Sequence, residues 1–191
     1  GSKTIQTTLS GSNYVLKDAT RGSGINTYDL NTSTNYNSAV NFTDNDNNWT
    51  TAEHTANKDN GALDAHWGAE MTYDYWMTKH NRNSFNNSGA AINSYVHYSS
   101  NYDNAFWDGS RMTYGDGSGT YFDILTSLDV AAHEIGHAVC ERTAGLVYSY
   151  ESGAMNEGFS DIWGAAVEAF SKNDDNDVWQ IGEEIGASTG Y

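Results

Sequence analysis

Two histidines four residues apart, His133 and His137, occur in the segment His133-Glu134-Ile135-Gly136-His137. On an α-helix, residues four apart share a face, so both imidazoles point to one spot. Apolar residues at helical spacing predict such a helix over 127–143, with Gly145 as its C-cap: Leu128, Val130, Ala131, Ile135, Ala138 and Val139. The segment therefore predicts a helix that presents two imidazoles side by side.

A pair of neutral imidazoles suits Zn²⁺, which takes about four tetrahedral ligands and leaves one position for water at catalytic sites. Glu134 directly follows the first histidine, so it can reach that open position and take a proton from the water. With six His and nine Glu in 191 residues, roughly 0.01 matches to this five-residue pattern are expected by chance. The alternative is a solvated helix face, or histidines satisfied by backbone carbonyls.

A third metal ligand has two possible sources. One class of zinc peptidases continues the helix with a glycine and a third histidine, but Cys140 and Thr143 occupy those positions. The other source is an acid on the next predicted helix, over 156–172, where Glu157 and Asp161 share a face. One carboxylate can bind the metal while the other accepts a ring N–H from a ligating histidine. A solvated acidic face is the alternative, but acids that face inward on a mostly apolar helix need a partner.

The fold class predicted is α+β, with a β-rich first part followed by the helix with the two histidines and a second helix with the third-ligand candidates. Helical spacing predicts one further helix over 62–80, after the start signal Asp59-Asn60-Gly61. Alternating or β-favouring residues predict strands elsewhere: 5–9, 13–17, 24–30, 91–98 and parts of 102–121.

Composition excludes several classes of function. Nine Lys and Arg against 25 Asp and Glu give a net charge of −16, which argues against binding to nucleic acid or anionic lipid and favours cation binding. The sequence contains no run of 18 apolar residues, so it predicts no membrane span. The single cysteine, Cys140, cannot form an internal disulfide. Its spacing from His137 raises the possibility of a thiolate ligand, but a small buried filler is the favoured interpretation.

The ordered set of motifs resembles the thermolysin family of zinc neutral proteases, loosely from about Ala19 to Glu184. The segments that carry the resemblance are these: Asp64-Ala65-His66-Trp67, Thr72-Tyr73-Asp74-Tyr75, Asn104-Ala105-Phe106-Trp107-Asp108-Gly109, Met112-Thr113-Tyr114-Gly115-Asp116-Gly117, His133–His137, Gly145-Leu146-Val147-Tyr148, Glu151-Ser152-Gly153-Ala154-Met155-Asn156-Glu157 and Ser160-Asp161-Ile162-Trp163-Gly164.

The resemblance implies which residues form the zinc site. His133, His137 and Glu157 would hold zinc, Asp161 would orient His133, and Asn156 would support His137.

It also implies a catalytic cleft. Glu134 would be the base that activates water and then passes the proton to the leaving nitrogen, and Tyr148 would donate to the developing oxyanion. Four residues would contact the substrate, the first two by pairing with its backbone as an added strand: Asn104, Ala105, Phe106 and Trp107. Without the family pattern, the two aromatic residues are more often part of a core.

Calcium is the second metal that the resemblance implies. Four acids are candidates for one shared site: Asp129, Glu168, Asp177 and Glu183. Gln180 stands where the family often has an acid, so one ion is expected there. A surface loop with alternating oxygen ligands is a weaker second candidate, through Asp44, Asp46 and Asn48. The alternatives are a solvated charge run and an ordinary Asn/Asp turn.

The resemblance divides the chain into an N-terminal domain over 1–147 and the start of a helical C-terminal domain over 148–191. Family members continue with a helical domain that closes the other wall of the cleft, so a companion helical domain or chain is an expected partner, beside a peptide or protein substrate. The expected location is extracellular, as a mature form from which a signal peptide and propeptide have been removed.

Two classes of function follow. The leading prediction is a zinc-dependent endopeptidase that hydrolyses internal peptide bonds of proteins. The alternative is a non-catalytic metal-binding fragment or folding module, inactive without the companion domain. An aminopeptidase is a minor third possibility, since the sequence offers no motif for an acid that would hold the substrate amine.

Overall fold

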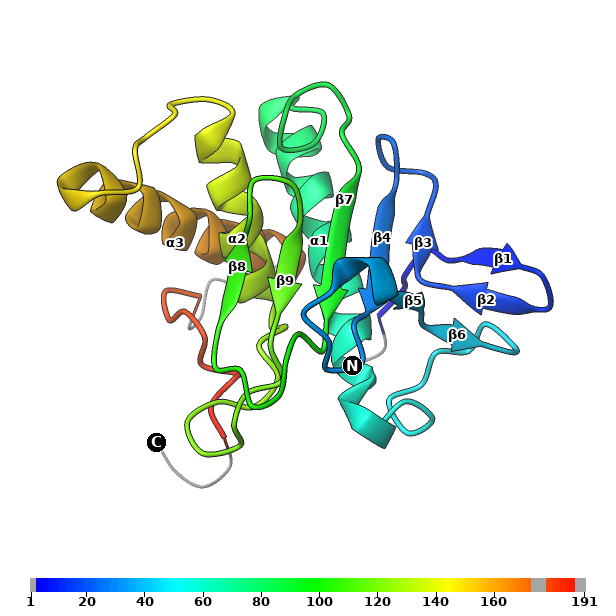
Figure 1. Ribbon diagram of the computed structural model, residues 1–191. Helices are drawn as coiled ribbons and strands as arrows, with labels where there is room; N and C mark the ends of the chain where they lie inside the picture. The colour runs from blue at the N-terminus through cyan, green and yellow to red at the C-terminus, as the bar shows by residue number, and fades with distance from the viewer. Residues whose placement is uncertain (1–2, 173–177, 188–191) are drawn as a thin grey trace.

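A mixed β-sheet lies beside three long helices in the computed structural model, which describes residues 3–172 and 178–187 (Figure 1). The sheet has the strand order β3-β4-β7-β9-β8, with β5 paired to β4, and a small second sheet has the order β1-β2-β6. Neighbours β4, β7 and β9 run parallel, whereas β8 pairs with β9 antiparallel and forms a free edge. The combination of helices with a mixed sheet confirms the predicted α+β class.

The strands are short, and in Ile92–Val96 the side chains alternate between buried and partly exposed. Their bounds are β1 Thr8–Ser10, β2 Asn13–Val15, β3 Lys17–Asp18, β4 Ile25–Asp29, β5 Val40–Asn41, β6 Thr43–Asp44, β7 Ile92–Val96, β8 Ala105–Trp107 and β9 Met112–Tyr114.

Helices α1 (Asn60–His80) and α2 (Leu128–Glu141) pack on the sheet, and α3 (Tyr150–Lys172) packs mainly on α2. Short 3₁₀ turns span Tyr36–Ser38 and Ala56–Lys58. Helix α2 ends at Glu141 with Arg142 as its C-cap, two residues before the predicted end at residue 143. Gly145, the predicted C-cap, lies beyond the helix with a φ of 57° and donates its N–H to the Cys140 carbonyl at 2.8 Å.

Glycines allow the helices to approach closely. A Cβ at Gly68 of α1 would lie 2.8 Å from the Ala131 Cβ of α2. A Cβ at Gly136, between the two histidines of α2, would lie 3.1 Å from the Ser160 Cα of α3. These contacts bring three helices together directly behind the histidine pair.

Two predicted elements differ from the structure. The strand expected over 5–9 is confined to Thr8–Ser10, because the backbone of Gln6 bonds to side chains of α1 rather than to another strand. Helix α3 begins at Tyr150, six residues before the predicted start at Asn156. Its first two turns contain small and polar residues and lack an apolar stripe from which a helix could be predicted.

Candidate metal centre and cleft

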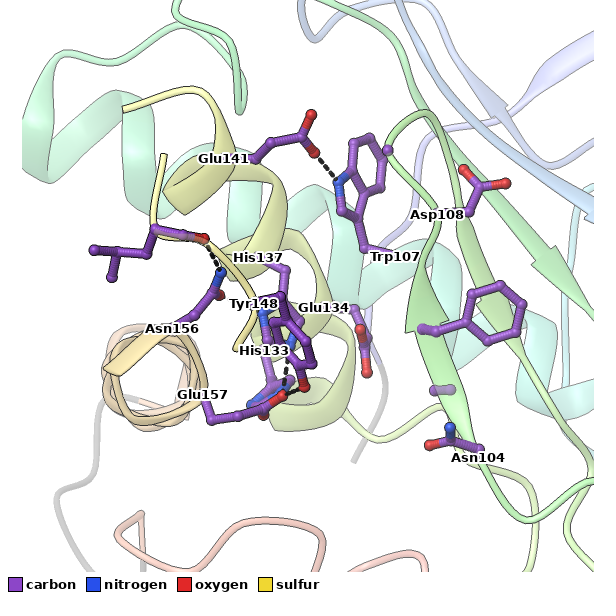
Figure 2. Close-up of a pocket in the computed structure, with 14 residues that line it drawn as sticks. Asn104, Trp107, Asp108, His133, Glu134, His137, Glu141, Tyr148, Asn156 and Glu157 are labelled. Carbon is purple, nitrogen blue, oxygen red and sulfur yellow. Dashed lines mark hydrogen bonds and ion pairs between the residues drawn. The ribbon is translucent and has the colours of Figure 1, made fainter. Parts of the chain in front are cut away.

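Helices α2 and α3 bring the three candidate metal ligands together (Figure 2). The Nε2 atoms of His133 and His137 lie 3.2 and 3.7 Å from the two carboxylate oxygens of Glu157. One atom from each of the three residues lies within 4.8 Å of the others. The two imidazole rings are 4.6 Å apart and nearly perpendicular, at 87°. Two imidazoles and one carboxylate around one point can hold a Zn²⁺ ion with three protein ligands.

The other nitrogen of each ring is held by α3. His133 Nδ1 lies 2.8 Å from Asp161 Oδ1, and His137 Nδ1 lies 2.6 Å from Asn156 Oδ1. Both partners offer an acceptor oxygen, so each ring carries its proton on Nδ1 and has a free lone pair on Nε2. The hydroxyl of Ser160, which sequence analysis missed, also reaches His137 Nδ1 at 3.1 Å. It stands four residues after Asn156, and that spacing could have revealed it.

Glu134 is a buried carboxylic acid beside these ligands. Burial raises the pKa of Glu134 to about 7, and the negative charge of Glu157 adds to the rise, while His133 and a hydrogen bond from the Trp107 backbone oppose it. A carboxyl group with a pKa near neutrality can both accept and release a proton at working pH.

A cleft of about 610 Å³ opens in front of the three ligands and Glu134. Its opposite wall is the edge strand β8, and all four predicted substrate contacts line it: Asn104, Ala105, Phe106 and Trp107. Four other residues line the cleft for which the sequence analysis gave no role: Asp108, Gly109, Glu141 and Leu146. The free edge of β8 offers unpaired backbone groups to an extended peptide.

Tyr148 also lines the cleft and is largely exposed. Its hydroxyl donates to the carboxylate of Glu157, and its ring lies 5.9 Å from that of His137. The hydroxyl is therefore next to the candidate metal position.

A second acidic cluster lies at the far end of α3. Glu168, Glu183 and Glu184 bring carboxylate oxygens within 4.8 Å of one another, and the buried Oε2 of Glu168 has no hydrogen-bond partner among the residues that the structure describes. The ammonium of Lys172 lies 2.5 Å from the other oxygen of Glu168. Carboxylates in this number can hold a Ca²⁺ ion. Glu184 was not predicted, although it directly follows Glu183.

The other predicted calcium ligands are placed differently. Both oxygens of Asp129 accept hydrogen bonds, one from the Gly182 N–H at 2.5 Å and the other from Val130 and Ser127. Asp177 lies outside the described residues. In the surface loop, Asp44 and Asp46 accept the backbone N–H of Asn48 at 3.2 and 2.9 Å. Such bonds shape an Asx turn.

Comparison with known proteins gives the family. Residues 1–141 match the thermolysin metallopeptidase catalytic domain, and residues 144–190 match the thermolysin metallopeptidase alpha-helical domain. The chain belongs to the thermolysin family of metallopeptidases. The family resemblance expected from the motifs is thus confirmed, whereas the predicted domain boundary after residue 147 stays a prediction.

Relatives within the family cover nearly the whole chain. A bacillolysin of Brevibacillus brevis is 54% identical over 96% of this chain. A thermolysin of Alicyclobacillus acidocaldarius is 47% identical over 90%. The chain spans only 32% and 30% of these two relatives. Among solved structures, the precursor of protealysin, a metalloproteinase from Serratia proteamaculans, matches with a TM-score of 0.75 and 34% identity, over 86% of this chain and 50% of that one.

Proposed function

We propose that this chain carries the metal centre and one wall of the cleft of a zinc-dependent endopeptidase, which cleaves internal peptide bonds of proteins. The observation that supports it most is the convergence of two Nε2 atoms and the Glu157 carboxylate in front of an open cleft. Membership of a metallopeptidase family supports the same reaction class.

The donor set fits zinc. His133, His137 and Glu157 would be the ligands, and Asp161 and Asn156 fix the ring tautomers that expose both Nε2 atoms. When bound, zinc supplies Lewis acidity that polarises water and the scissile carbonyl.

Glu134 would perform the proton transfers. Its carboxylate takes a proton from the attacking water as the oxygen bonds to the peptide carbonyl carbon. The same carboxyl group then gives that proton to the amide nitrogen as the C–N bond breaks, so the residue ends in its starting state. A pKa of about 7 suits both steps. Tyr148 would turn its hydroxyl from Glu157 to the oxyanion that develops on the carbonyl oxygen.

The edge strand would hold the substrate. An extended peptide can pair with the free edge of β8 through Asn104 and Ala105, while Phe106 and Trp107 flank its side chains. Since backbone pairing is independent of sequence, this mode suits an enzyme that acts within many protein chains.

Calcium and a helical partner complete the proposal. The Glu168 cluster would take one Ca²⁺ ion. The support for this is the buried Glu168 Oε2, which has no hydrogen-bond partner in the described part of the chain. The surface loop of Asp44, Asp46 and Asn48 would be a second, weaker calcium site. A companion helical domain would cover the exposed apolar residues of α3: Tyr150, Met155, Phe159 and Ile162.

Location and other partners are proposed from the same evidence. Secretion after removal of a signal peptide and propeptide would suit the family and the acidic surface. Among the residues that the structure describes, the search for a helix with the length and hydropathy of a membrane span finds none.

The decisive experiment compares the wild type with Glu134→Gln. Each is loaded with zinc and calcium and tested on a peptide blocked at both ends, alone and with a fragment carrying the rest of the helical domain of a relative. We expect the wild type to cleave the peptide and the variant to retain about one zinc per chain but lose roughly 10²–10⁴-fold in turnover.

The other outcomes decide between the alternatives. Turnover retained by the variant would overturn the assignment of Glu134 as the base. Zinc bound by a wild type that cleaves nothing under either condition would favour the non-catalytic metal-binding module.

A further inference from the structure

One side chain, Trp107, connects the two walls of the cleft. It ends the edge strand β8, and its indole N–H donates to the Glu141 carboxylate in the last turn of α2 at 2.7 Å (Figure 2). The ring also packs against Phe85, whose ring centroid lies 5.2 Å away. The backbone of the same residue hydrogen-bonds to Glu134. Glu134 and Glu141 are seven residues apart, so both face the cleft from one side of α2.

A second bond lies next to the first. The guanidinium of Arg142 donates to the carbonyl of Gly109, in the turn after β8, at 3.2 Å. Glu141 and Arg142 thus hold successive parts of the β8–β9 connection. Together with the hydrogen bond between the Trp107 backbone and Glu134, these two bonds join α2 and its C-terminal end to β8 and the turn after it.

We propose that Glu141 is a positioning residue. By accepting the Trp107 indole N–H, it fixes the edge strand at a set distance from the metal-binding helix, so that a peptide paired with β8 presents its carbonyl to Glu134. The inference rests on the proposed endopeptidase function, because the substrate must pair with this strand.

The shortness of β8 explains why a single hydrogen bond to its last residue can matter. The strand is only three residues long and pairs with β9 on one side alone. A short edge strand has few ladder hydrogen bonds to hold its position, so its contacts with α2 matter more. A displacement of about 1 Å in a substrate-positioning element can cost about 10²-fold in rate.

The test uses three variants of the zinc-loaded protein. Glu141→Ala removes the acceptor, Glu141→Gln removes the charge but keeps an acceptor oxygen, and Trp107→Phe removes the donor. We expect Glu141→Ala and Trp107→Phe each to lower kcat/KM about threefold to tenfold, a loss of up to about 1.4 kcal/mol. We expect Glu141→Gln to stay within about twofold of wild type, and the double variant Glu141→Ala/Trp107→Phe to lose no more than either single one. Glu151→Ala, which removes an exposed acid from α3, is the matched control and should leave kcat/KM unchanged.

A second measurement does not depend on turnover. Hydrogen exchange of the Trp107 indole N–H, followed by NMR, should be slow in the wild type and in Glu141→Gln, and fast in Glu141→Ala, with zinc content equal in all three. If Glu141→Gln loses as much activity as Glu141→Ala, or if the two single losses add in the double variant, the proposal is wrong.

The two proposals fail in different ways. A wild type that binds zinc but cleaves no peptide contradicts the endopeptidase function. A wild type that cleaves peptide while Glu141→Ala keeps both its activity and its slow indole exchange contradicts only the role of Glu141.

Discussion

Two helices of this protein each place a histidine one turn before another polar residue, yet the two pairs are used in opposite ways. On α2, His133 and His137 hold their Nδ1 atoms against α3 and leave both Nε2 atoms at the cleft. On α1, His66 and Glu70 are fully buried. His66 Nε2 donates to the Gln6 carbonyl and Nδ1 accepts from the Thr27 hydroxyl, each at 2.9 Å.

The second pair holds a segment of backbone rather than an ion. Glu70 Oε1 accepts the N–H of Gln6 at 2.8 Å, so His66 and Glu70 bind the C=O and the N–H of the same residue. Both ring nitrogens of His66 are engaged, and none remains for a metal. The comparison teaches that a free ring nitrogen, more than the spacing of the histidines, distinguishes a candidate metal ligand from a structural histidine.

Removing one histidine from each pair tests this distinction most strongly. His137→Gln should reduce zinc affinity by more than the roughly 10–100-fold that an outer hydrogen-bond partner contributes. His66→Gln should keep its zinc content, because no metal-binding nitrogen is lost. Equilibrium dialysis against zinc measures both. If His66→Gln does not fold, Glu70→Gln serves in its place, since its amide oxygen still accepts the Gln6 N–H. Loss of zinc from that folded variant would contradict the comparison.

The buried pair on α1 predicts a particular dependence of stability on pH. Burial lowers the pKa of His66 to about 4, so the unfolded chain binds the extra proton, and stability falls as pH falls from 6.5 towards 4. Burial raises the pKa of Glu70 to about 7, so the folded chain binds the extra proton, and stability falls as pH rises from 4.5 towards 7. The two effects oppose each other, each with an upper bound of about 3 kcal/mol.

Glu70→Gln removes one of these two effects. Its stability relative to wild type should therefore rise by up to about 3 kcal/mol between pH 4.5 and 7. Urea unfolding of both proteins in identical buffers measures this difference, and metal binding common to the two cancels. A difference that stays constant across this range would show that Glu70 is ionised throughout.

The convergence of the candidate metal ligands could be predicted from sequence because these residues are close in the chain and on helices. Helical spacing places His133 beside His137, and the next helix supplies Glu157. The bond between Gln6 and α1 could not be predicted, since it joins a side chain to a backbone group 60 residues away. A strand was therefore expected over 5–9. The early start of α3 was missed because its first two turns, which are largely exposed, lack an apolar periodicity.

An outer partner of the metal centre should have a smaller effect than a ligand. Asp161→Asn keeps the volume but replaces the charged acceptor of His133 Nδ1, which lies 2.8 Å away. We expect zinc affinity to fall about 10–100-fold and the fold to persist, because the Asp161 side chain is 48% exposed. Zinc titration with a competing chelator measures the affinity, and circular dichroism checks the fold. Unchanged affinity would show that the histidine tautomer is fixed by other means.

The smallest expected effect concerns the missed hydroxyl. Ser160→Ala removes a contact of 3.1 Å to His137 Nδ1 but leaves Asn156 in place at 2.6 Å. A single neutral hydrogen bond contributes about 1 kcal/mol, so zinc affinity should fall by about fivefold or less. The same chelator competition measures it. A loss as large as that of Asp161→Asn would mean that Ser160, rather than Asn156, is the main support of His137.

The glycine between the two histidines has a consequence for engineering. Because any larger side chain at Gly136 would meet the Ser160 Cα of α3 at 3.1 Å, it would push away the helix that carries Glu157. Packing between α2 and α3 and the dimensions of the ligand set therefore cannot be redesigned separately. A variant in which this seam is filled to raise heat resistance should therefore bind metal less tightly.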